Sequence, residues 1–106
     1  MNLTHLIHDV RRDLKAPKLP VVIGECTGPW GGDCGDPAAL MIRKTQKQVA
    51  KKAEFAGSVK FIETHDFVRK AENSPSDEIY HEFKNGETCF LVGDALGKGM
   101  VGLLSK

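Results

Sequence analysis

The chain has 106 residues, of which 41% are hydrophobic and 27% are charged. This length allows at most one domain, and the composition is too ordinary for a disordered or fibrous protein. The formal charge of +1 favours neither a nucleic-acid partner nor an anionic membrane surface. The apolar runs are far shorter than the ~20 residues of a membrane span, and no signal peptide is visible.

Three cysteines, Cys26, Cys34 and Cys89, are spread along the chain. Their odd number argues against a disulfide scaffold, and no Cys/His set has the spacing of a structural zinc site. Cys26 and Cys34 could pair across a loop. Three free thiols are the default expectation.

The first half of the chain predicts a helix, a strand and a loop. Apolar residues at helical spacing predict an amphipathic helix over Asn2–Lys15, which ends before Pro17. The β-branched run Leu19–Ile23 is typical of a strand that is buried on both faces of a parallel sheet. A long glycine-rich loop, Gly24–Asp36, follows it.

The second half predicts another helix, strand and helix. Asp36 and Pro37 provide an N-cap and a first helical residue for a helix that extends to about Glu54. A second strand is expected at Val59–Thr64. Asn85 opens the last helix, which is apolar over much of its circumference, so we expect it to be largely buried.

The predicted order α-β-α-β-α implies an α/β fold with a right-handed crossover and parallel strands covered by helices. Doubly wound sheets normally have more strands than two, and both strands here have the pattern of central strands with no protected edge. We therefore expect a piece of a larger α/β domain. The remaining strands lie before residue 1, or a partner supplies them.

His81 is the first candidate for chemistry, because it follows the second strand and catalytic groups gather at the carboxyl edge of open α/β sheets. Glu78 lies three residues upstream, with Asp77 beside it. Such a carboxylate can accept the ring Nδ1–H and leave Nε2 free as a general base. A surface histidine in an acidic loop is the alternative.

Other patterns allow both a functional and a structural interpretation. His5 and His8 have a spacing that can share a metal ion, but they lie on a polar helix face beside Arg11, which favours a solvated pair. The glycine-rich loop precedes a helix N-terminus, yet it lacks a phosphate-binding motif and carries acidic residues, so an active-site wall is the better interpretation. Cys34 could be an activated thiol, but no arginine follows at phosphatase spacing.

Two residues are candidates for substrate binding. His65 directly follows the second strand and rivals His81 for a catalytic role, although Thr64 and Asp66 beside it fit a structural turn equally well. Trp30, in the glycine-rich loop, could stack on a sugar ring or cap the core.

Several blocks of sequence together form a family pattern, and the most specific is a histidine at a fixed distance before a glycine-punctuated helix. The blocks are Asn2–Leu14, Pro20–Glu25, Thr64–Val68, Tyr80–Phe83 and Gly86–Met100. In these blocks the chain resembles the C-terminal part of the carbohydrate-esterase domain typified by sialate O-acetylesterases, a branch of the SGNH hydrolases. The resemblance covers nearly the whole chain but only the final part of the family's domain.

The resemblance implies a three-layer α/β/α, flavodoxin-like SGNH hydrolase fold with a parallel sheet, of which residues 1–106 form only the C-terminal part. It implies a serine nucleophile on the first strand of the domain, oxyanion donors on middle segments, and a histidine on the last loop. His81 takes the place of that histidine. Many members have an aspartate three residues before it, where this chain has Glu78, with Asp77 as the local alternative.

None of the four serines lies in a Gly-x-Ser turn after an apolar strand, so we expect the nucleophile to lie outside this chain. The resemblance then implies a serine–histidine esterase that acts on acetylated carbohydrate without a cofactor or metal ion, from a secreted or periplasmic parent. The isolated chain should be inactive. The alternative is a small non-enzymatic binding or interaction module that completes its sheet by self-association.

Overall fold

The computed structural model describes residues 2–27, 37–76 and 83–105. Within these residues it has three α-helices and two strands: α1 (Asn2–Asp13), β1 (Val21–Gly24), α2 (Pro37–Ala50), β2 (Val59–Ile62) and α3 (Gly86–Leu104). Short 3-10 helices lie at Ala53–Phe55, His65–Phe67 and Ala71–Asn73. This order confirms the predicted α/β class.

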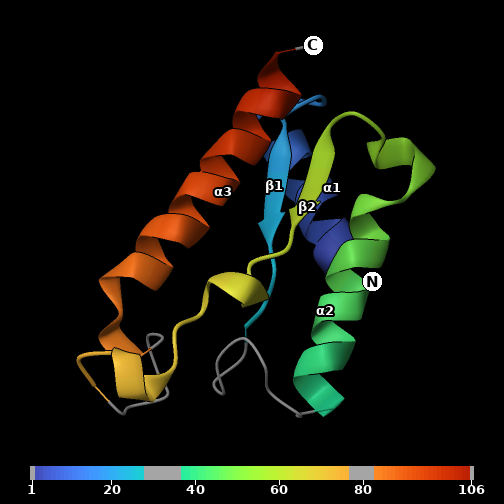
Figure 1. Ribbon diagram of the computed structural model, residues 1–106. Coiled ribbons are helices and arrows are strands. Elements are labelled where there is room, and N and C mark those ends of the chain that lie inside the picture. The colour runs from blue at the N-terminus through green and yellow to red at the C-terminus, as the bar shows by residue number, and fades with distance from the viewer. Residues whose placement is uncertain (1, 28–36, 77–82, 106) are drawn as a thin grey trace.

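The two strands form a parallel sheet in which Val21 lies opposite Val59 and Gly24 lies opposite Ile62 (Figure 1). The N–H of Val21 donates to the carbonyl of Ser58, and the N–H of Glu25 donates to that of Ile62. Odd-numbered residues of β1 therefore direct their backbone groups toward β2. Even-numbered residues direct theirs to the outer edge.

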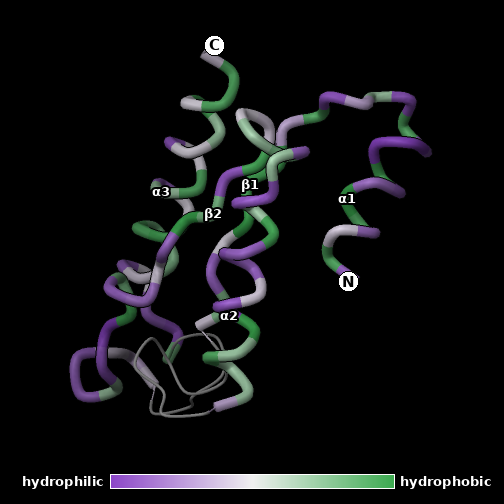
Figure 2. Tube along the Cα trace, turned by 90° about the vertical axis from the view of Figure 1, so that its right-hand side faces the viewer, coloured by the Kyte–Doolittle hydropathy of each residue, from purple (hydrophilic) through white to green (hydrophobic). Residues whose placement is uncertain are grey.

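Helices cover both faces of this sheet, with α3 and α1 at opposite sides of the strands (Figure 2). On one face α3 approaches closely, because a Cβ at Gly99 would lie 2.7 Å from Cδ1 of Ile62. On the other face the core is formed by side chains from α1, the two strands and the segment at the end of α2: Ile7, Ile23, Val49, Phe55 and Val59.

Local chemistry explains where several elements begin. Pro37 starts α2, as predicted from its fixed φ and missing N–H. Gly57 has a φ of 79°, which a glycine adopts without steric cost, and it precedes β2. Asn85 caps α3 through a side chain that accepts the N–H of Thr88.

The prediction that the last helix is largely buried is wrong. Among the described residues of α3 only Thr88 and Gly99 are buried, whereas Phe90 and Leu104 are 71% and 65% exposed. A sheet of two strands covers one side of a helix and leaves the rest open. For the same reason β1 is only partly buried, with Ile23 as its one buried residue.

The second helix also ends earlier than predicted, at Ala50, and the chain then forms a 3-10 helix that buries Phe55. The radius of gyration is 15.1 Å, whereas a compact domain of about 100 residues has ~13 Å. None of the described helices combines the length and apolarity that crossing a lipid bilayer requires.

Candidate active site

Glu25 joins the carboxyl ends of the two strands. It directly follows β1, and its side chain is 5% exposed. Its Oε1 accepts the backbone N–H groups of Thr64 and His65 at 3.1 and 2.8 Å. In return the hydroxyl of Thr64 donates to the carbonyl of Glu25 at 3.3 Å. The carboxylate thus replaces the backbone ladder at the point where the strands separate.

The imidazole of His65 lies between two carboxylates. Its Nδ1 is 2.7 Å from Oε1 of Glu25, and its Nε2 is 3.3 Å from Oδ1 of Asp66. The hydrogen bond with Glu25 raises the pKa of His65 above its ordinary value, and the charges of both carboxylates act in the same direction, against desolvation and the charge of Arg43. The protonated ring fits this arrangement, because only imidazolium has two donors.

The exit of β1 is also fastened to α2. Gln46 accepts the N–H of Cys26 at 2.9 Å and donates to the carbonyl of Gly24 at 3.3 Å. Arg43 donates to the carbonyls of Cys26 and Thr27. The backbone that leaves β1 is therefore held on both sides, by α2 and by Glu25.

The segment after β2 is fastened to the first turn of α3. The amide nitrogen of Asn85 donates to the carbonyl of Asn73 at 3.2 Å and to Oγ of Ser74 at 3.0 Å. The hydroxyl of Thr88 accepts the backbone N–H of Arg69 at 3.0 Å. These bonds hold the residues that follow β2 against the start of α3.

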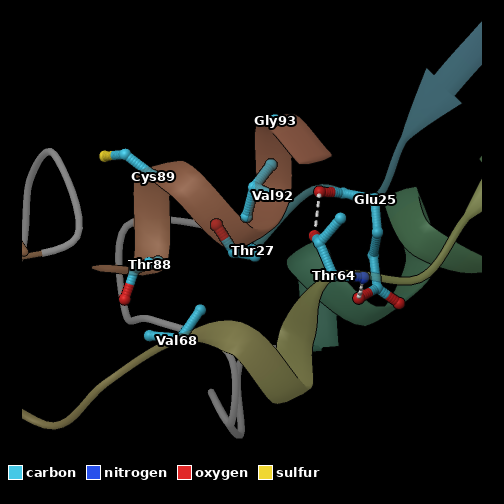
Figure 3. A pocket seen from close by; sticks show the side chains of 8 residues that line it. All are labelled: Glu25, Thr27, Thr64, Val68, Thr88, Cys89, Val92 and Gly93. Atoms are coloured by element: carbon cyan, nitrogen blue, oxygen red, sulfur yellow. Dashed lines mark hydrogen bonds between the residues drawn. The ribbon is translucent and has the colours of Figure 1, made fainter. Parts of the chain in front are cut away.

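A cavity of about 340 Å³ lies between these three segments. Its lining comes from the exit of β1, from the residues after β2 and from the first turns of α3, as Figure 3 shows. Val68 and Val92 contribute apolar walls, and Glu25 and Thr27 contribute polar groups. This volume lies at the small end of the range for ligand sites.

The structure places the predicted site residues as follows. His65 lies at the carboxyl edge of the sheet, as expected, but it is not part of the cavity lining. His81, Glu78, Asp77, Trp30 and Cys34 lie outside the described residues. The flanks of the segment that carries His81 are joined, because the N–H of Ser76 donates to the carbonyl of Phe83 at 3.2 Å.

The pairing of Glu25 with His65 was not predicted from the sequence, where Glu25 belonged to the glycine-rich loop and to the block Pro20–Glu25. The signal was a carboxylate directly after one parallel strand and a histidine directly after the next. Because parallel strands end at the same edge, two such residues meet.

Of the two histidines considered for a shared metal ion, His5 is exposed on α1 and His8 has structural partners. His8 pairs with Glu54, with Nε2 2.9 Å from Oε1, and its ring packs against Phe55. Within residues 2–27, 37–76 and 83–105, no group of three or more His, Cys, Asp or Glu side chains could hold a metal ion. Cys26 and Cys89 are free thiols.

Comparisons with models of protein families, with curated proteins and with solved structures gave no match to this chain.

Proposed function

We propose that the chain is the C-terminal part of a three-layer SGNH-type hydrolase domain that removes O-acetyl groups from carbohydrate. The observation that carries this proposal is the common edge at which the chemistry would occur. The carboxyl end of β1, the residues after β2 and the start of α3 all line one cavity, and ligands of open α/β sheets bind at that edge. The residues directly before α3 include His81.

In this proposal a serine outside residues 1–106 attacks the acetyl carbonyl carbon while His81 takes the proton from its hydroxyl. The protonated His81 then gives that proton to the sugar oxygen as the ester bond breaks, which leaves an acetyl-serine. Water hydrolyses this intermediate with His81 again as base, and acetate is released. Glu78, or Asp77 in its place, orients His81, and Trp30 and His65 contact the sugar.

The second candidate is a non-enzymatic module that completes its sheet by self-association. One observation favours it: large apolar side chains are exposed on all three helices, among them Leu6, Met41 and Phe90. Leu3, Met41 and Ile42 line one groove, and apolar surface that is contiguous marks an interaction surface.

The experiment begins with the DNA upstream of the Met1 codon. If the reading frame continues and encodes an apolar strand followed by a Gly-x-Ser turn, the longer protein is expressed and its release of acetate from O-acetylated sugars is measured. His81→Ala should lower kcat/KM by about 10²–10⁴-fold, the usual contribution of a general base.

His5→Ala, on the exposed face of α1, is the matched control and should leave kcat/KM unchanged. A kcat/KM for His81→Ala within a few-fold of the wild-type value would contradict the role of His81. A stop codon closely upstream, with its own ribosome-binding site, would favour the self-associating module.

A further inference from the structure

The outer edge of β1 is not paired with another strand in the described part of the chain, and the backbone groups that it presents follow from the register of the sheet. Even-numbered residues face outward, so the edge presents Pro20, Val22 and Gly24. Pro20 has no N–H, and the carbonyl of Gly24 already accepts from Gln46. Four groups have no partner among residues 2–27, 37–76 and 83–105: the N–H and carbonyl of Val22, the N–H of Gly24 and the carbonyl of Pro20. Within the described residues no strand lies beside this edge.

The outer edge of β2, in contrast, is charged. A groove along it is lined by Lys47, Lys51, Lys60 and Glu63, and Nζ of Lys47 lies 2.8 Å from Oε1 of Glu63. Charged side chains, lysine above all, protect edge strands from pairing with other strands. The prediction that neither strand has a protected edge is therefore wrong for β2.

The two sides of α3 also differ, with an apolar side next to β1 (the β1 flank) and a charged side next to β2 (the β2 flank). The side chain of Leu96 lies against Gly24 of β1, and Gly102 lies beside Lys60 of β2, which together fix the rotation of the helix. At 100° per residue the β1 flank then carries small and apolar residues, in the order Cys89, Gly93, Gly97, Met100 and Leu104. The β2 flank carries Asp94 and Lys98, which form an ion pair at 2.7 Å.

On the opposite face of the sheet the β1 side is apolar as well. A groove of about 460 Å³ between α1 and α2 is lined by Leu3, Met41, Ile42 and Gln46. Gln46 bonds the outward-facing backbone groups of Gly24 and Cys26, so this groove adjoins the outer edge of β1. Met41 is 69% exposed there.

We propose that the outer edge of β1 pairs with the same edge of a second copy of this chain. The two strands would run antiparallel about a twofold axis at Val22 and join the two sheets into one of four strands. The N–H and carbonyl of Val22 then bond those of the partner's Val22. The N–H of Gly24 bonds the carbonyl of the partner's Pro20, so this register uses all four free groups on each copy.

The helix spacing supports a second copy as the occupant. Because α3 packs equally on β1 and β2, two copies would place their α3 helices two strand spacings apart, about 9.6 Å. Packed helices lie 8–10 Å apart. Apart from the adjoining residues and backbone of α3 itself, no atom of the described residues lies within 4 Å of the Cβ position at Gly93 or Gly97, so they leave room there for the partner's α3.

This inference rests on the second candidate function, the self-associating module, for which it specifies the surface and the register, and it is measured without esterase activity. A strand from a nucleophile-bearing part would use the same edge, so the two occupants exclude each other. Loss of dimerisation would leave the esterase proposal standing, and an active esterase would not establish the dimer.

The experiment is sedimentation velocity of the chain over a wide concentration range. We expect a concentration-dependent species of twice the 11.6 kDa of one chain. Gly97→Gln should give a folded monomer, because it improves the helix propensity of α3 while filling the space that the second α3 needs. Lys98→Gln, one residue along on the β2 flank, should remain a dimer. A monomeric wild type, open-ended aggregates, or a dimer that persists in Gly97→Gln would overturn the proposal.

Amide hydrogen exchange gives a second readout that needs no variant. The amides of Val22 and Gly24 should be protected at concentrations where the dimer forms and should exchange faster on dilution, whereas those of Phe61 and Glu63 on the outer edge of β2 should not change. A dimer with unprotected Val22 and Gly24 would assign the interface to another surface. A monomer that binds the separately expressed upstream segment through these amides would assign the edge to the nucleophile-bearing part, and either result overturns the proposal.

Discussion

Oε1 of Glu25 lies 2.7 Å from Nδ1 of His65 and 2.8 Å from the backbone nitrogen of the same residue. These two residues are 40 positions apart in the sequence. One buried oxygen therefore holds both the ring and the backbone of His65. The pair connects the exits of β1 and β2, from which the candidate active site is built.

Replacing Glu25 should change the titration of His65. In Glu25→Gln the negative charge is lost, so we expect the pKa of His65 to fall toward its ordinary value. Weaker hydrogen bonds to the two backbone N–H groups should lower the free energy of unfolding by about 1–3 kcal/mol. NMR titration of the ring protons and urea denaturation measure the two effects.

Glu72→Gln is a suitable control, because Glu72 is an exposed carboxylate in the 3-10 helix at Ala71–Asn73. It should alter neither quantity. If His65 titrates identically in Glu25→Gln and in the wild type, the contact between Glu25 and His65 does not control the protonation of the ring.

The raised pKa of His65 predicts a pH dependence of stability. A group whose pKa is higher in the folded chain contributes stability that is fully present below its unfolded pKa, about 6.5. That contribution is lost as the pH rises through the folded pKa. Because the side chain is 36% exposed, we expect the effect to stay below about 1 kcal/mol.

The comparison of wild type with His65→Gln isolates this contribution, since the other titrating groups are common to both chains. The urea midpoint of the wild type should exceed that of His65→Gln at pH 6, and this difference should shrink as the pH is raised to 8.5. If the wild type exceeds His65→Gln in urea midpoint by the same amount at both pH values, the difference comes from packing or neutral hydrogen bonds and not from the charge of His65.

Elements with a local chemical signal were predictable from the sequence. The starts of α2 and α3 were placed correctly, because Pro37 and Asn85 act on the backbone within one turn. The strand at Val21–Gly24 is displaced from the predicted run, and α2 stops at Ala50 instead of near Glu54. The end of α2 depends on Phe55, whose burial in the core is a tertiary contact that no local pattern encodes.

The burial of α3 and the pairing of Glu25 with His65 were harder to predict, for different reasons. The apolar residues around α3 indicate that the helix packs against other protein surface. They do not indicate whether that surface belongs to this chain. The pairing of Glu25 with His65 required knowing that β1 and β2 are neighbours in one parallel sheet. The parallel arrangement placed His65 at the carboxyl edge of the sheet, but only the register of β1 against β2 brings Glu25 beside it.

Asn85 should stabilise both α3 and the segment before it. The residue is 6% exposed, caps the helix through Oδ1 and holds Asn73 and Ser74 through its amide nitrogen. Asn85→Ala should lower the free energy of unfolding by about 1–3 kcal/mol, from the lost cap and the unpaired carbonyl of Asn73. Urea denaturation measures this change.

Asn85→Asp separates the two contributions, because it keeps the acceptor for the N–H of Thr88 but loses both amide donors. Its free energy of unfolding should lie between that of the wild type and that of Asn85→Ala. If Asn85→Asp is as stable as the wild type, the contacts to Asn73 and Ser74 contribute nothing, and the segment after β2 is held by other bonds, such as that from Arg69 to Thr88.

Arg11 should be the arginine of α1 that stabilises the fold. The sequence pattern grouped it with the polar face, yet it is 8% exposed. It donates to the carbonyl of Leu19 at 2.7 Å and to Oγ of Ser58 at 3.0 Å, with its guanidinium over the ring of Phe55. These contacts fasten α1 to the residues that precede both strands.

Arg11→Met keeps an unbranched apolar stem but leaves the carbonyl of Leu19 without its donor, so we expect the free energy of unfolding to fall by about 1–3 kcal/mol. Arg12→Met is the matched control, because Arg12 is exposed and pairs only with the exposed Asp9 and Asp13 in the described part of the chain. Its urea midpoint should equal that of the wild type. Equal losses in the two variants would mean that the charge of α1, and not the contacts of Arg11 with Leu19 and Ser58, holds the helix in place.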